Sequence, residues 1–247
     1  MKIVDIKNYH TIDYKKISSN EFVNIHTGEV KMATEKTNNV RAMNSLRRSF
    51  SRLSLIINCN FYGDKSEAFI TLSYDYKVTE DKEISRDIDS LWNGFQRKNK
   101  EKIPYRCLII VEYNKYGNPH YHILLKRLDG QNISLEELSQ KFLWNKGSRD
   151  IRPLYTTDGL SEYLTPFNVR RKRKQIRYYK PGMQIYRRRG EFVNPKKIKT
   201  SYSDALNLAR MCSMTEYKRQ SFDIVNAITN NVVNKINKIY MKTEDYQ

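Results

Sequence analysis

The sequence has 247 residues, 39% of them hydrophobic, which is enough chain to bury one core of ordinary domain size. Its 45 lysines and arginines outnumber 27 aspartates and glutamates, so the formal net charge is +18 and a polyanionic partner, most commonly nucleic acid, is indicated. No stretch has the length and apolarity of a transmembrane helix or a signal peptide, and the three cysteines lack metal or redox spacing. We therefore expect a cytoplasmic protein that does not insert into a membrane.

Apolar periodicity predicts alternating strands and helices along the chain. After short strands or an arm over residues 1–40, helices are expected at 38–60, 84–98, 134–143 and 158–165, and strands at 69–74, 107–111, 120–126 and 150–155. This order predicts an α+β fold, an antiparallel sheet with helices packed on it. The main domain is expected to span 41–195. Residues 200–247 are expected to form a helical C-terminal extension, including a helix that begins near Ser221.

Two of the four histidines, His120 and His122, lie two residues apart on the strand 120–126. Side chains at this spacing share one face of a strand, so both imidazoles can reach one metal ion. If residues 114–118 form a hairpin loop, Glu112 on the preceding strand lies directly opposite His120 and shares that face. Two imidazoles and one carboxylate suit Mn²⁺ or Mg²⁺, and Zn²⁺ can also use such a set. An exposed His-x-His strand without a metal is the alternative interpretation.

These residues resemble the HUH endonuclease superfamily, in which two histidines flank a hydrophobic residue, here Tyr121. The form Glu112…Gly117-x-Pro119-His120-x-His122, preceded by the strand Phe69–Tyr74, is more similar to its replication initiators than to its relaxases. The resemblance covers roughly residues 40–195 and implies an RRM- or ferredoxin-like sheet. It also implies metal-dependent nicking of single-stranded DNA at the origin of a rolling-circle plasmid or phage, through a covalent 5′-phosphotyrosine.

The resemblance places the attacking tyrosine on the helix after the fourth strand, where this chain has Tyr163. The lysine that is expected three residues later is replaced by Pro166, so a cation from the following basic run is expected to substitute for it. Tyr178 and Tyr179 are the rival candidates for the nucleophile.

The segment 169–190 combines basic side chains with tyrosines, as single-stranded nucleic acid binding requires. The expected DNA contacts are Arg170, Arg171, Lys172, Arg173, Lys174, Arg177, Tyr178, Tyr179, Lys180, Arg187, Arg188 and Arg189. A disordered basic tail is the alternative to this interpretation.

The leading interpretation is therefore a nicking enzyme, with a divalent metal as cofactor and single-stranded origin DNA as partner. A nucleic-acid-binding protein without catalysis and a single-tyrosine transposase are the alternatives. The sequence contains no Walker A motif, so a host helicase is the expected partner for unwinding.

Overall fold

The structure is a computed structural model that describes residues 6–9, 14–18, 21–32, 38–157, 159–167, 170–196, 200–211, 214–225 and 232–243. The chain divides into two compact units. One unit is formed by residues 42–195, and the other combines residues 1–41 with residues 196–247. Within the described ranges, no helix combines the length and the apolarity needed to cross a membrane.

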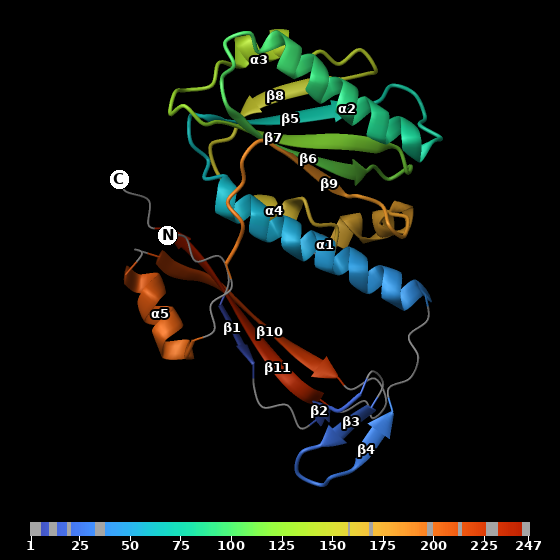
Figure 1. The fold of residues 1–247 in the computed structure, drawn as a ribbon, viewed down its shortest axis with the longest axis vertical. Helices are drawn as coiled ribbons and strands as arrows, with labels where there is room; N and C mark the ends of the chain where they lie inside the picture. Colours follow the sequence, from blue (N-terminus) through green and yellow to red (C-terminus); the bar gives the residue numbers. More distant parts are fainter. Residues whose placement is uncertain are drawn as a thin grey trace. The chain divides into compact units, whose positions relative to one another are not determined.

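The unit 42–195 is built on a five-stranded antiparallel sheet with the strand order β8-β5-β7-β6-β9 (Figure 1). Its strands are β5 (Glu67–Ser73), β6 (Tyr105–Tyr113), β7 (Pro119–Arg127), β8 (Arg149–Pro153) and β9 (Tyr186–Arg189). Its helices are α1 (Asn38–Asn60), α2 (Asp81–Lys98), α3 (Leu135–Lys141), α4 (Leu160–Tyr163) and the 3-10 helix Arg170–Tyr178. The predicted α+β class is confirmed.

Helices cover both faces of this sheet, with α2 and α3 on one side and α1 and α4 on the other (Figure 1). The central strands are therefore apolar almost without interruption, and every residue from Cys107 to Tyr113 on β6 is buried. Phe50 of α1 packs edge-on against Phe167 and Tyr179, with ring centroids 5.8 and 5.4 Å away. This packing joins α1 to the segment that follows α4.

Local sequence signals account for the turns and helix ends of this unit. Ser134 accepts a hydrogen bond from the Glu137 amide at 3.2 Å, so the predicted N-cap of α3 is confirmed. Asn114 accepts hydrogen bonds from two amides of the β6–β7 loop through its side-chain oxygen. Gly117 adopts a φ of +85° in this loop, a conformation that favours glycine.

The second unit contains two three-stranded sheets and one helix. Its elements are β1 (Ile6–Tyr9), β2 (Tyr14–Lys16), β3 (Glu21–Asn24), β4 (Val30–Met32), α5 (Tyr202–Met211), β10 (Met214–Val225) and β11 (Val232–Thr243). The strands pair in the orders β1-β11-β10 and β2-β3-β4. The short strands expected near the N-terminus are thus present.

The prediction of a helical C-terminal extension holds for α5 and is wrong for residues 214–225 and 232–243, which form the hairpin strands β10 and β11. Apolar residues three or four apart suggested a helix there. The segment is also rich in Val, Ile, Thr and Asn, which are weak helix formers. Because β11 pairs with strands on both sides, tertiary pairing decides between the two patterns.

Candidate metal centre and catalytic cavity

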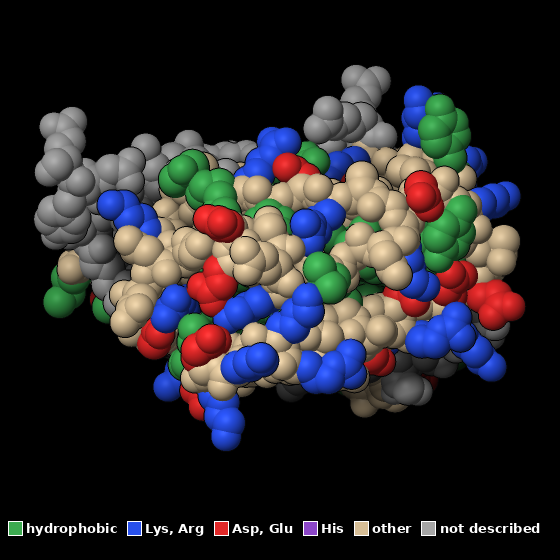
Figure 2. Space-filling model, turned by 90° about the horizontal axis from the view of Figure 1, so that it is seen from above, with side chains coloured by type: hydrophobic (Ala, Val, Ile, Leu, Met, Phe, Trp, Pro, Cys, Tyr) green, Lys and Arg blue, Asp and Glu red, His purple; other side chains and the backbone are tan. Residues whose placement is uncertain are grey.

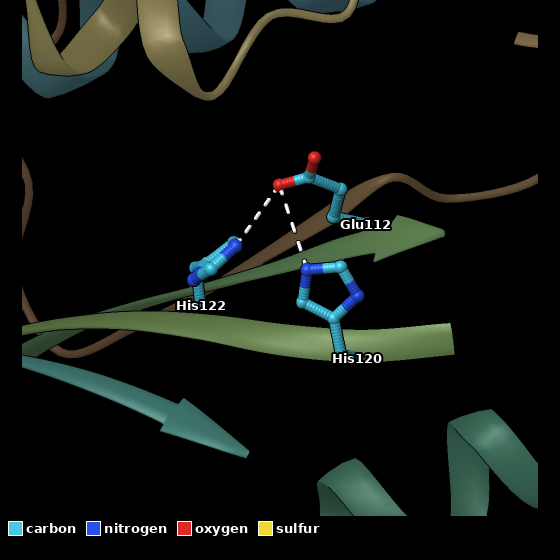
Figure 3. A group of neighbouring side chains, drawn as sticks. All are labelled: Glu112, His120 and His122. Atoms are coloured by element: carbon cyan, nitrogen blue, oxygen red, sulfur yellow. Dashed lines mark hydrogen bonds and ion pairs between the residues drawn. The ribbon is translucent and has the colours of Figure 1, made fainter. Parts of the chain in front are cut away.

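Glu112, His120 and His122 converge on the face of the sheet that α1 and α4 cover (Figure 3). The register pairs Glu112 with His120 across the β6–β7 ladder, as the hairpin argument predicts. The ligand atoms of the three side chains lie within 4.8 Å of one another, close enough to share one ion. In the described part of the chain, no other group of three or more His, Cys, Asp or Glu side chains converges in this way.

One oxygen of the Glu112 carboxylate faces both imidazoles. Its Oε2 lies 2.9 Å from Nε2 of His122 and 3.7 Å from Nε2 of His120. On its other side, His122 has its Nδ1 3.3 Å from Oγ1 of Thr71 and its ring stacked on Phe69. Contacts of this kind fix the orientation of a histidine ligand and leave its Nε2 directed at the metal position.

The protonation states favour cation binding. Burial acts to raise the pKa of Glu112, but hydrogen bonds from His120, His122 and Lys172 outweigh it and hold the pKa below its ordinary value. The carboxylate therefore stays charged. Burial lowers the pKa of His122 despite its hydrogen bond to Glu112, so at neutral pH this imidazole is in the neutral form that binds metals. A buried carboxylate with two imidazoles fits a divalent ion such as Mn²⁺ or Mg²⁺.

A cavity of about 440 Å³ opens beside the two histidines. Its walls come from β5, β7, β8, the β6–β7 loop and α4, and they consist of Phe69, Thr71, Ser73, Tyr74, Asn114, Asn118, Pro119, His120, His122, Asp150, Arg152 and Tyr163. Aromatic rings, amides and charged groups thus surround the histidine edge, as expected for a polar ligand that carries rings.

Tyr163 is the tyrosine of the predicted catalytic helix, and the structure brings it to this cavity. It ends the four-residue helix α4, its ring centroid lies 6.2 Å from that of His122, and 41% of its surface is exposed. An exposed phenol beside the histidine pair is open to a ligand in the cavity.

The rival tyrosines lie outside the cavity. Tyr179 is buried against Phe50 and Tyr113, and burial raises its pKa, which disfavours the phenolate. Tyr178 donates a hydrogen bond to the Lys115 carbonyl, and its ring lies against Gly117. The expectation that Tyr179 stacks on DNA bases is wrong, because its ring belongs to the core.

Lys172 substitutes in space for the lysine missing after Tyr163. Its Nζ lies 2.6 Å from Oε1 of Glu112, donates to the Tyr163 carbonyl at 2.9 Å and sits 3.7 Å from the centroid of the Tyr163 ring. The side chain is buried, so its expected role as a surface DNA contact is also wrong. The sequence predicts a replacement cation from this run but does not identify which residue supplies it.

The other basic residues of the segment divide by location. Those that are exposed are Lys174, Arg177, Lys180 and Arg188. Arg187 and Arg189 both bind Asp89 of α2, on the face opposite the histidines, so their placement does not support a contact with DNA in the cavity. The side chains of Arg170, Arg171 and Arg173 lie outside the described residues.

The α2 and α3 side of the unit shows lysines and arginines interspersed with carboxylates, and no described histidine is visible there (Figure 2). Positive charge is thus spread over that face without a cluster at one place. A surface of mixed charges is typical of a solvated face.

Asp150 and Arg152 of the edge strand β8 were missed by the sequence reasoning. They share the histidine face through β5, line the cavity and form an ion pair at 2.7 Å. Their two-residue spacing shows only that they share a face. The β5–β8 register that brings them to the cavity involves pairing across about eighty residues of sequence, which local patterns do not encode.

Comparison with protein families gave one match, covering less than half of the chain. Residues 67–179 match a family of replication-associated proteins, the ORF2 type. The matched segment contains the three candidate ligands, Tyr163 and Lys172. Neither the search of curated proteins nor that of solved structures gave a match. The family match supports a role for this chain in DNA replication initiation.

Proposed function

We propose that this chain is a replication initiator of the HUH type that nicks and rejoins one DNA strand at a rolling-circle origin. The observation that carries the proposal is the convergence of Glu112, His120 and His122 beside the exposed phenol of Tyr163. A protein that only binds DNA has no need of a buried ligand set next to a nucleophile. The match to replication-associated proteins over the same residues agrees with it.

Each group at the site has a distinct part in this reaction. Glu112, His120 and His122 would hold Mn²⁺ or Mg²⁺, and the bound ion would supply a charge that stabilises the developing charge on the scissile phosphate. Lys172 adds a second positive charge next to the tyrosine. Tyr163 supplies the attacking oxygen, and its exposure leaves that oxygen accessible to DNA in the cavity.

The chemical step transfers a phosphodiester from one oxygen to another. The phenolic oxygen of Tyr163 bonds to phosphorus and releases its proton to solvent, while the bond from phosphorus to the 3′ oxygen breaks. That oxygen takes up a proton and becomes the free 3′ hydroxyl that can prime synthesis. The 5′ phosphate stays on the tyrosine, and a later attack by a 3′ hydroxyl reverses the step and rejoins the strand.

The single strand is held by charge and by stacking. The net charge of +18 favours a polyanion in general, and the exposed side chains Lys174, Arg177 and Lys180 lie on the segment that follows Tyr163. Arg152 lies in the cavity wall, where it can contact a phosphate near the scissile one. A host helicase or supercoiling would open the origin.

Incubation of the purified protein with a single-stranded oligonucleotide from the origin of its own replicon tests the proposal. We expect a covalent adduct only with Mn²⁺ or Mg²⁺, and mass spectrometry should locate the 5′ phosphate on Tyr163. Tyr163→Phe and His120→Ala should each abolish the adduct, while Tyr178→Phe, the control, should retain it. Salt-dependent binding without any adduct would instead support a non-catalytic DNA-binding protein.

A further inference from the structure

Lys172 connects three segments that are distant in the sequence. Its ammonium lies on the 3-10 helix, contacts Glu112 at the end of β6 and contacts Tyr163 at the end of α4. An ammonium group has three donors, and these contacts use two of them while the charge lies over the Tyr163 ring. Buried ammonium groups are rare unless paired, so this placement indicates a specific role.

The helix that carries Tyr163 is too short to position it alone. It has four residues, and its hydrogen bonds include those from the Tyr163 amide to Gly159 and from the Leu164 amide to Leu160. Pro166 follows within one turn and cannot continue the helix. A single turn of helix is only marginally stable, so a contact from outside is needed to fix it.

The Glu112 carboxylate is shared between two kinds of partner. Its Oε2 faces the imidazoles, with His122 at 2.9 Å, and its Oε1 faces Lys172. The ammonium therefore occupies the side of the carboxylate away from the shared metal position. It need not leave when an ion binds, and His122 holds the carboxylate even without it.

We propose that Lys172 is a positioning residue that fixes the Tyr163 segment to the metal-binding carboxylate and so holds the phenol at a set distance from the metal. This inference rests on the proposed function and adds a residue that the tyrosine motif does not supply. One ammonium acts on the Tyr163 carbonyl and ring, while the same ammonium is anchored on Glu112.

Three measurements on Lys172→Met test it. Hydrogen exchange at the α4 amides should become roughly ten-fold faster or more, the factor expected from losing one charged hydrogen bond, while β6 and β7 amides stay protected. Mn²⁺ should bind at least as tightly as before, because a competing cation is gone and His122 still holds Glu112. Adduct formation in a single turnover should be about 10- to 100-fold slower, as expected when a nucleophile loses its alignment.

Two further variants control for charge and for folding. Lys174→Met removes the same charge from an exposed position two residues away, so it should weaken DNA binding but leave the single-turnover rate at saturating DNA unchanged. Lys172→Arg keeps the cation and should restore α4 protection and most of the rate. If Lys172→Met does not fold, a Lys172→Arg protein that binds Mn²⁺ yet loses α4 protection would overturn the inference.

The results separate this inference from the proposed function. Unchanged α4 exchange, or a loss of Mn²⁺ affinity in parallel with the rate, would show that Lys172 does not position the tyrosine. If the unchanged chain forms no adduct while α4 exchange still depends on Lys172, the positioning role stands and the nicking proposal fails.

Discussion

Replacement of Glu112 by Gln separates the charge of the candidate ligand from its shape. Glu112→Gln keeps the volume of the side chain but removes the only carboxylate of the ligand group. It also leaves the buried ammonium of Lys172 without its counter-charge. Both folding and metal binding should therefore change, and urea unfolding followed by circular dichroism, in EDTA and in excess Mn²⁺, measures both.

The expected magnitudes follow from the burial of the pair, whose side chains are 7% and 5% exposed. Breaking a buried ion pair on one side costs about 3 kcal/mol or more of unfolding free energy in EDTA. In the unchanged protein, Mn²⁺ at a hundred times its Kd should add about 2.7 kcal/mol. In Glu112→Gln this metal-dependent increment should fall to nearly zero.

Glu67 provides the matched control. Its carboxylate is fully buried and forms an ion pair with Lys126 at 2.7 Å on the same sheet, away from the cavity. Glu67→Gln should also lower the stability in EDTA, yet it should keep the full Mn²⁺ increment. The reasoning is refuted if Glu112→Gln retains that increment, or if both variants lose it equally.

Three further predictions concern the cavity wall, a turn and the buried tyrosines. Arg152→Ala should weaken single-strand binding several-fold and reduce the salt slope by about 0.7, whereas Arg149→Ala, on the opposite face of β8, should not; fluorescence anisotropy at several salt concentrations measures both. Gly117→Ala should cost about 1–3 kcal/mol in thermal unfolding, because its Cβ would lie 2.6 Å from a tyrosine ring carbon, and more than Gly130→Ala, which has a similar φ and open space. Burial raises the pKa of Tyr74, so only the unfolded chain ionises near pH 10 and stability should fall above that pH. Tyr74→Phe should reduce this loss by up to about 1.4 kcal/mol per pH unit, and an equal loss in the variant would contradict the assignment.

The main unit could be predicted from sequence because each of its elements carries a strong local signal. The apolar stripe of 38–60 matches α1, and the continuous apolar run after Arg106 can only be a strand covered on both faces. The C-terminal hairpin could not be predicted in this way. Its apolar spacing fits a helix and its composition fits a strand, and pairing with β1 makes the difference.

The metal-binding group was predictable because one hairpin fixes it. The loop between β6 and β7 sets the register, and register determines which side chains face each other. Lys172, Asp150 and Arg152 reach the site through packing of segments far apart in the chain, which no local pattern specifies. The tendency of single-stranded DNA binding to use tyrosines likewise did not reveal that Tyr179 lies in the core.

The most direct test of the metal centre is anomalous diffraction at the manganese absorption edge from crystals soaked in Mn²⁺. We predict one strong peak within bonding distance of a Glu112 oxygen and of Nε2 of both His120 and His122. A peak held by other residues, or no peak at these three side chains in a protein that still nicks DNA with Mn²⁺, would contradict the account.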